Sequence, residues 1–460
     1  MGMQSGFPCF EVEFDKEGAV SDPNQVKALK AALLPGDPTD LIVFSHGWNN
    51  DMAEARQLYT KFLASFRKRV DSGLPGIAGR KFAVMAVLWP SKKFADQDLI
   101  PSGAAGVGSA IPDHAILDQL QALKGFFGGQ GADAALDKAK ALVPKLESSP
   151  AASKEFAELI RSAVTHGASS AKGDTEDASV EFYKLDGEEM MNRLAKPVPL
   201  MLGGAQSHGA AGLGGGSGPA GGPGMGGPGM GHGGAAGIGS FFAGIKSAAM
   251  NLLNLTTYYQ MKSRAGDVGT RGLAPIIRDI KGLHAPLKIH FAGHSFGGRL
   301  LTSAVSSLDK NATQPQAVPI ETLSLLQAAF SHYGFSDKWD GVHPGAFRNV
   351  LTDKQVKGPI IATCTVNDKA VGLAYPLASL LGGQVAAGIG DKNDKYGGMG
   401  RNGAQMTPEA VNGKLLAVGK PYEFAAGKIH NLLADEFVKG HSDIGGEEVA
   451  YAVLAAISRT

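Results

Sequence analysis

The chain has 460 residues, with 44 basic and 43 acidic side chains and a formal net charge of +1. This length is enough to bury a large hydrophobic core without disulfide or metal crosslinks. The balanced charge argues against a nucleic-acid-binding protein, which usually carries a basic excess. Cys9 and Cys364 are far apart and belong to no CxxC motif or Cys/His cluster, so we expect no metal site.

The beginning of the chain shows no targeting segment. Residues 1–15 lack a basic stretch followed by an apolar run, so they do not read as a signal peptide. Gly6 stands where a myristoylation motif has Ser or Thr. No apolar stretch reaches the roughly 20 residues that a membrane-spanning helix needs. We therefore expect a soluble, cytoplasmic protein, with export independent of a cleavable signal left open.

Residues 1–90 alternate between strand and helix patterns. Apolar and polar residues alternate at 10–14, as in a strand with one wet face. Residues 41–44 are an unbroken apolar run, typical of a parallel strand buried on both faces. A helical spacing of apolar residues at 54–70 and a second buried strand at 82–88 follow. Strand, helix and strand in this order predict a parallel crossover unit.

Residues 91–261 interrupt this pattern. The first part of the insertion is rich in Ala and Lys and is predicted to be helical. Its centre, residues 203–239, is low in complexity and repeats Gly-Gly-Pro-Gly-Met in tandem at 221–230. Such a composition cannot bury enough apolar surface to offset chain entropy, so we expect a disordered linker. His208 and His232 lie in it without convergent partners, which argues against a metal site there.

A helix is expected directly after the linker. Apolar residues between Phe241 and Tyr259 fall on one helical face. The first interpretation is a helix packed on the body of the protein. The alternative is a lid that adds apolar surface to a substrate pocket, in which case Phe242 and Leu253 would contact the substrate.

Residues 262–460 return to alternating helices and strands, which predicts one mostly parallel, doubly wound α/β sheet with a helical cap insertion. Asp443 is expected to cap the terminal helix. The predicted elements are a helix at 274–283, a strand at 287–292, a helix at 295–308, strands at 323–326 and 359–364, a strand within 422–433, and a helix at 447–458.

The pentapeptide Gly293-His294-Ser295-Phe296-Gly297 matches the pattern G-x-S-x-G of a nucleophile elbow. The pattern alone is common, but here it follows an expected strand and opens an expected helix, as the mechanism requires. The two glycines would avoid clashes with the neighbouring strand and helix. The helix N-terminus would favour developing negative charge. We therefore predict that Ser295 is a nucleophile rather than a helix cap.

A serine hydroxyl needs a base to take its proton, and in this architecture the chain order is Ser, acid, His. Asp368 directly follows a late buried strand. Asp337 and Asp340 follow the strand before it and are interpreted as solvated loop carboxylates. His441 precedes the terminal helix, whereas His430 falls within the last expected strand and suits a structural role. We therefore expect Asp368 to be the acid and His441 to be the base.

A tetrahedral intermediate needs two backbone donors for its oxyanion. One is expected from Phe296, the residue after the nucleophile, and the other from the loop at 45–50, which follows an early strand. Trp48 is the predicted donor in that loop, although it could also be ordinary core. Trp48 and His294 are predicted to line the substrate-binding site. His46 is interpreted as a structural residue that braces the loop.

Together these features resemble the α/β-hydrolase superfamily of esterases, lipases and serine peptidases. The likeness rests on the His-Gly-Trp loop, the Gly-His-Ser-Phe-Gly turn, the late Asp368 and the Gly-His-Ser-Asp ending. It covers about residues 10–90 and 265–458. Segments 260–266 and 396–403 resemble a little-characterised bacterial branch. The large insertion departs from the pattern and leaves the form of the cap and pocket open.

The resemblance implies an acyl-enzyme mechanism but no particular substrate. We expect a carboxylesterase or lipase-like serine hydrolase without metal or organic cofactor, acting on a small ester or acyl compound. Transient contact with a lipid surface is compatible with such substrates, and the sequence indicates no particular oligomeric state. The alternatives are a serine peptidase or amidase using the same triad, and a non-catalytic scaffold that binds partners through its Gly- and Met-rich tract.

Overall fold

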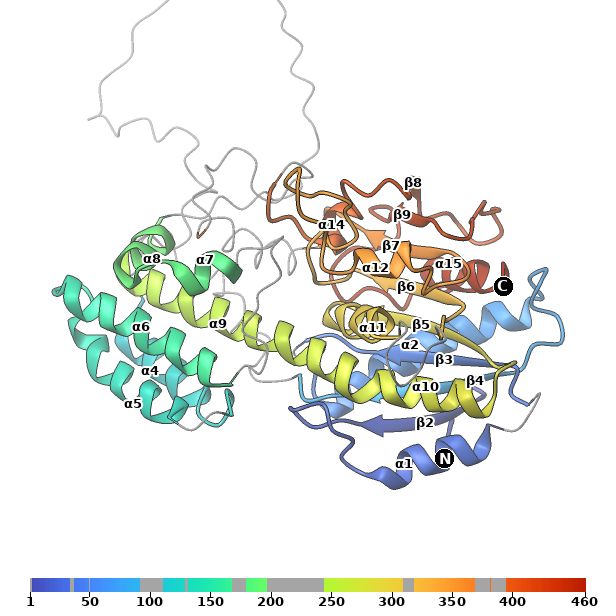
Figure 1. Cartoon of the computed structure of the whole chain (residues 1–460), viewed down its shortest axis with the longest axis horizontal. Coiled ribbons are helices and arrows are strands. Elements are labelled where there is room, and N and C mark those ends of the chain that lie inside the picture. The colour runs from blue at the N-terminus through green and yellow to red at the C-terminus, as the bar shows by residue number, and fades with distance from the viewer. Residues whose placement is uncertain are drawn as a thin grey trace, which may run out of the picture.

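A nine-stranded sheet and a helical lobe lie side by side and are joined by one long helix (Figure 1). The structure is a computed structural model that describes residues 2–33, 37–48, 50–91, 111–128, 131–167, 179–196, 244–308, 318–368, 381 and 394–460. The predicted linker at 203–239 falls outside these residues, as do Asn49, His208, His232, Phe241 and Phe242.

The sheet has the order β1-β2-β4-β3-β5-β6-β7-β9-β8, and every pair except β1–β2 is parallel. The predicted mostly parallel α/β sheet is therefore confirmed. The outermost strands β1 and β8 were not predicted from the sequence, because β1 has only three residues and β8 is largely exposed. The strands are β1 (Gly2–Gln4), β2 (Phe7–Glu13), β3 (Asp40–Ser45), β4 (Phe82–Leu88), β5 (Lys288–His294), β6 (Thr322–Leu326), β7 (Ile360–Cys364), β8 (Ala410–Lys414) and β9 (Ile429–Leu433).

Helices cover both faces of the sheet. α2 (Met52–Asp71) and α15 (Glu447–Ile457) pack on one face, where their apolar side chains share a buried cluster with β3 and β4. α1 (Pro23–Ala32), α10 (Ala274–Leu283) and α11 (Phe296–Ser306) pack on the other. Burial on both faces explains why the central strands read as unbroken apolar runs. The short helices α12 (Arg348–Thr352) and α14 (Met399–Asn402) lie in the loops after β6 and β7.

The insertion contains a lobe of helices, as the Ala- and Lys-rich sequence predicted. The green and teal lobe in Figure 1 packs against the first half of α9 (Ile245–Asp267). No helix within the described ranges is long and apolar enough to cross a membrane. The lobe consists of α4 (Asp113–Ala122), α5 (Ala132–Leu142), the 3₁₀ turn η1 (Val143–Lys145), α6 (Pro150–Gly167), α7 (Ser179–Lys184) and α8 (Gly187–Leu194).

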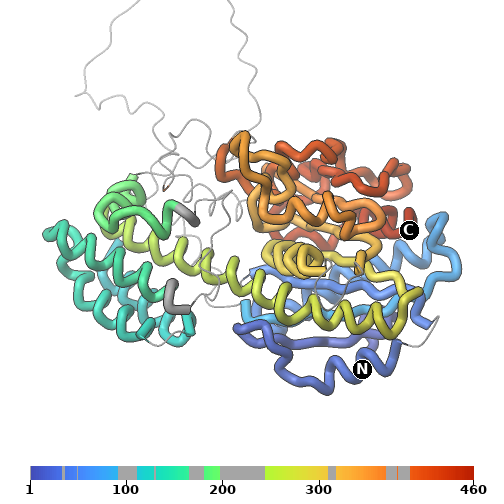
Figure 2. The backbone as a smooth tube through the Cα atoms, viewed as in Figure 1, coloured from blue at the N-terminus to red at the C-terminus, as the bar shows by residue number. Residues whose placement is uncertain are grey.

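Helix α9 belongs to both parts of the molecule (Figure 2). Its first half contacts α6 and α8, its second half contacts α11, and it continues through a π-helical segment at Val268–Leu273 into α10. The boundary predicted between residues 261 and 262 therefore lies inside one continuous helix. Leu253 is fully buried within a core that extends from the sheet into the lobe. This packing favours the interpretation of a packed helix over that of a lid.

The chain changes direction across the sheet between β3 and β5. β4 follows β3 on one side, whereas β6, β7 and β9 follow β5 on the other. Ser45, the last residue of β3, lies opposite Gly293 of β5. Ligands of open α/β sheets bind outside the carboxyl ends of the strands at such a switch point. The loops after β3 and β5 are therefore the expected position of a binding or active site.

Candidate active site

Ser295 occupies a strained turn between β5 and α11. Its φ is 56° and its ψ is −125°, a positive-φ conformation that is costly for a residue with a side chain. Three backbone hydrogen bonds hold it: its N–H donates to Leu326 O at 3.0 Å, and its carbonyl accepts from the Ala329 and Gly298 N–H groups, both at 3.0 Å. Contacts with the end of β6 and the loop after it therefore hold Ser295 in this conformation. A strained residue persists only when its surroundings fix it in this way.

The glycines of the turn are required by close backbone approach, as predicted. A Cβ on Gly293 would lie 2.6 Å from the carbonyl oxygen of Gly297. A Cβ on Gly297 would lie 2.3 Å from the carbonyl oxygen of Ser45, at the end of β3. Neither oxygen can move without breaking the strand or helix that carries it. These contacts explain the G-x-S-x-G spacing physically.

The structure brings the three predicted catalytic residues together in one hydrogen-bonded chain. His441 Nε2 lies 2.8 Å from Ser295 Oγ, and His441 Nδ1 lies 2.8 Å from Asp368 Oδ2. Because a carboxylate only accepts, Nδ1 carries the proton and Nε2 is left as the acceptor for the serine hydroxyl. This tautomer is the one in which His441 can act as a base.

Asp368 is fully buried at the end of a braced turn after β7. Thr365 Oγ1 and the Val366 N–H donate to Asp435 Oδ1 at 2.8 and 3.0 Å, and the Asn367 amide donates to Asp435 O at 3.2 Å. Asp435 therefore fixes the turn that carries the acid to the segment that follows β9. Sequence analysis missed Asp435, because a carboxylate in a polar loop has no distinguishing pattern.

His441 lies in a turn between β9 and α15. The Lys439 N–H donates to Asp443 Oδ2 at 3.1 Å, and the Asp443 N–H donates to Gly440 O at 3.2 Å. The prediction that Asp443 caps the terminal helix is wrong, because that helix begins at Glu447 with Gly446 as its N-cap. Asp443 instead closes the turn around the predicted base.

The competing residues lie in other surroundings. His430 is in β9, where its Nε2 accepts from the Ala425 N–H at 3.0 Å, and burial lowers its pKa. Asp337 and Asp340 are exposed, and Asp340 Oδ2 lies 2.7 Å from His343 Nδ1. These positions agree with the structural role predicted for His430 and the loop roles predicted for the two aspartates.

The predicted oxyanion donors flank Ser295 on two sides. A Cβ on Gly47 would lie 2.4 Å from Ser295 Cβ, so the loop after β3 passes directly against the nucleophile. Trp48 follows in that loop, and its ring centroid lies 6.0 Å from that of Phe296. The Phe296 N–H opens α11, where the first amides have no partner in the helix. The arrangement can place two backbone donors beside one reacting oxygen.

His46 braces this loop from inside. Its Nδ1 donates to Gly47 O at 2.9 Å, its Nε2 accepts from the Trp89 N–H at 3.3 Å, and its ring stacks on Trp89. Burial lowers the pKa of His46 to about 4, so the ring stays neutral. These contacts agree with the structural role predicted for His46.

His294 lies behind the nucleophile rather than in an open pocket. Its side chain is buried, its Nε2 lies 2.9 Å from the carbonyl oxygen of His441, and the two imidazole rings are 4.8 Å apart. Burial and the neighbouring His441 lower the pKa of His294 to about 3. The substrate contact predicted for His294 stays a prediction.

Aromatic rings connect the site to the helical lobe. The ring centroid of Tyr258 in α9 lies 5.2 Å from that of Phe296, and the ring centroid of Tyr259 lies 5.0 Å from that of Phe182 in α7. These four rings are buried, whereas Trp48, whose ring also lies near that of Phe296, is partly exposed. α9 therefore reaches the residue next to the nucleophile, a contact that the helical pattern alone could not reveal.

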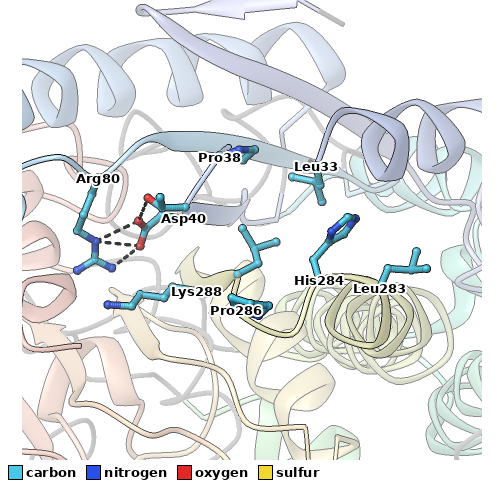
Figure 3. A pocket seen from close by; sticks show the side chains of 10 residues that line it. Leu33, Pro38, Asp40, Arg80, Leu283, His284, Pro286 and Lys288 are labelled. Atoms are coloured by element: carbon cyan, nitrogen blue, oxygen red, sulfur yellow. Dashed lines mark hydrogen bonds and ion pairs between the residues drawn. The ribbon is translucent and has the colours of Figure 1, made fainter. Parts of the chain in front are cut away.

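A cavity of about 410 Å³ lies at the opposite, amino edge of the strands (Figure 3). Leu33, Leu283 and Leu287 form its apolar wall, and Asp40 and Arg80 form one charged end. Hydrogen bonds hold the Asp40 carboxylate there, and they are made by the Arg80, His290 and Thr39 side chains. The cavity thus belongs to the other end of β3 and β5, away from Ser295.

Comparisons with protein-family models, with curated proteins and with solved structures gave no significant match. Within the described parts of the chain, no group of three or more His, Cys, Asp or Glu side chains could hold a metal ion. The geometry around Ser295 therefore carries the functional argument.

Proposed function

We propose that the protein is a serine hydrolase with the α/β-hydrolase fold that cleaves carboxylic esters through an acyl-enzyme intermediate. The observation that carries this proposal is the chain Ser295–His441–Asp368, with both hydrogen bonds at 2.8 Å and the serine in a strained turn. Sheet order supports the fold assignment, because the nucleophile, acid and base follow β5, β7 and β9 at one edge.

Acylation begins with proton transfer from Ser295 Oγ to His441 Nε2. The oxygen attacks the ester carbonyl, and the backbone N–H groups of Phe296 and Trp48 stabilise the oxyanion that forms. The Asp368 carboxylate holds the imidazole and stabilises its positive charge. The bond to the alcohol then breaks, and His441 returns the proton to the leaving oxygen. The products are an acyl-serine and a free alcohol.

Deacylation repeats the sequence with water. His441 Nε2 takes a proton from the water, whose oxygen attacks the acyl carbonyl of the ester on Ser295. Collapse of the second tetrahedral intermediate releases the acid and returns the proton to the serine oxygen. No cofactor enters either half of the reaction.

Labelling with a fluorophosphonate probe tests the proposal directly. We expect covalent labelling at Ser295, mapped by peptide mass spectrometry, and its loss in Ser295→Ala. A panel of p-nitrophenyl esters and aminoacyl anilides then separates esterase from peptidase or amidase activity. Ser307, a partly exposed serine at the other end of α11, is a control, and Ser307→Ala should label normally. Absence of labelling in the folded wild-type protein would overturn the proposed function and favour a scaffold.

A further inference from the structure

One side chain joins the strand that carries the nucleophile to the turn that carries the base. His294 is the last residue of β5 and directly precedes Ser295. Its Nε2 lies 2.9 Å from the main-chain oxygen of His441. A carbonyl oxygen only accepts, so Nε2 carries the proton and donates this bond. The bond spans 147 residues of sequence and ties together two of the three catalytic positions.

The tautomer of His294 leaves Nδ1 without a proton. That atom is buried and has no hydrogen-bond partner. It faces Gly47, where an added Cβ would lie 3.1 Å away. An unpaired buried acceptor costs free energy. The cost is understandable if the N–H donor on the opposite side of the ring has a function.

The turn around His441 needs such a tether. Lys439 and Ser442 are exposed, and two hydrogen bonds close the turn between residues 439 and 443. The start of the segment is anchored by the Asn367 amide, which donates to Val438 O at 2.9 Å, but this contact precedes His441 by three residues. Surface turns move more than the sheet that supports them. The end of β5 is buried between β3 and β6, so a hydrogen bond from it transfers the rigidity of the sheet to the base.

We propose that His294 is a positioning residue that holds the backbone of His441, so that its Nε2 stays within reach of Ser295 Oγ. The expected effect on reaction rates rests on the proposed function. The effect on the Asp368–His441 hydrogen bond does not, because that bond should depend on His294 whatever the substrate. His294 stays neutral beside His441 because it is buried. It therefore adds no like charge when His441 takes up the proton.

Two substitutions separate the hydrogen bond from the packing of the ring. His294→Gln keeps an N–H donor near the position of Nε2, whereas His294→Phe keeps a ring and removes the donor. His430→Phe is the matched control, because it removes a buried strand histidine that does not touch the base. We would measure the fluorophosphonate labelling rate, kcat and KM for an ester, and the downfield proton resonance of the His441–Asp368 hydrogen bond.

We expect His294→Phe to lower the labelling rate and kcat roughly 10- to 100-fold, since misplacement of a catalytic group by 1 Å can cost that much. KM should change less than about threefold, and the downfield resonance should broaden or disappear. His294→Gln should recover most of the rate and the resonance, and His430→Phe should match the wild type.

Equal losses in His294→Gln and His294→Phe, or no loss in either, would overturn the inference. If the wild-type protein does not react with the probe or the ester, the proposed function fails. The resonance would still report, without any substrate, whether His294 holds His441. The two failures are therefore distinguishable.

Discussion

The two edges of the sheet each carry an aspartate, a histidine and a hydroxyl in a hydrogen-bonded chain. At the carboxyl edge, His441 lies 2.8 Å from both the Asp368 carboxylate and the Ser295 hydroxyl. At the amino edge, His290 lies 2.9 Å from Asp40 and 2.9 Å from the hydroxyl of Thr322. The residue types and distances are almost the same, so neither can distinguish a catalytic group from a structural one.

The two hydrogen-bonded groups of residues differ in their surroundings. Burial raises the pKa of Asp40, but hydrogen bonds from His290, Arg80 and Thr39 outweigh burial and hold this pKa below its usual range. The guanidinium of Arg80 thus neutralises the carboxylate and weakens its effect on His290. Thr322 is fully buried inside a regular strand and lacks a strained turn. The catalysis proposed at Ser295 therefore depends on the turn, the flanking amides and the partly exposed His441.

Removing the two hydroxyls should give the largest contrast. Ser295→Ala should abolish probe labelling and ester hydrolysis, because it removes the atom that forms the covalent bond. Thr322→Val should leave the labelling rate within about twofold and lower the free energy of unfolding by about 1–3 kcal/mol, since it leaves a buried acceptor of His290 unpaired. Labelling rates and urea denaturation of both variants test this. Labelling at Thr322 would refute the assignment of the two edges.

The two aspartates should separate activity from stability. Asp368→Asn keeps the shape but favours the wrong imidazole tautomer, so kcat should fall roughly 10⁴-fold. Asp40→Asn leaves the largely buried Arg80 guanidinium without its counter-charge, so the free energy of unfolding should fall by about 3–5 kcal/mol. Activity of the folded Asp40→Asn fraction should be near that of the wild type. A loss of kcat in that fraction comparable to the loss in Asp368→Asn would contradict the comparison.

Gly47 tests the close approach of the loop after β3 to the nucleophile. A methyl group at this position would overlap Ser295 Cβ, so the loop that carries the Trp48 amide must move in Gly47→Ala. We expect the labelling rate to fall about 10²- to 10³-fold, the usual effect of losing one oxyanion donor. Gly282→Ala in α10 is the control, because a Cβ there meets nothing within 4 Å and Ala favours a helix. A labelling rate for Gly47→Ala equal to that control would remove Trp48 from the proposed mechanism.

The sequence was informative where one local pattern determines one feature. Buried apolar runs located the central strands, and the order of Ser295, Asp368 and His441 along the chain was enough to name all three candidates. The remaining contacts are between distant residues without a local pattern. Asp40 and His290 are 250 positions apart, and nothing in either neighbourhood marks their pairing. The full extent of α9 was missed because its second half is buried on several sides and shows no single apolar face.

Protonation of buried histidines involves both edges of the sheet. Burial lowers the pKa of five histidines in the described part of the chain: His46 to about 4, His294 and His332 to about 3, and His290 and His430 in the same direction. Below pH 6.5 the unfolded chain binds protons at these sites while the folded protein does not, so the free energy of unfolding falls as pH decreases.

The slope that these groups contribute is about 1.4 kcal/mol per pH unit for each histidine. Urea denaturation at pH 7.5, 6 and 5 should show the decrease, and His332→Gln should reduce the slope by the contribution of one histidine. An unfolding free energy that stays constant from pH 7.5 to pH 5 would mean that these histidines become protonated in the folded protein. His294 would then place a positive charge beside His441, and the neutral tether proposed for the base would be lost.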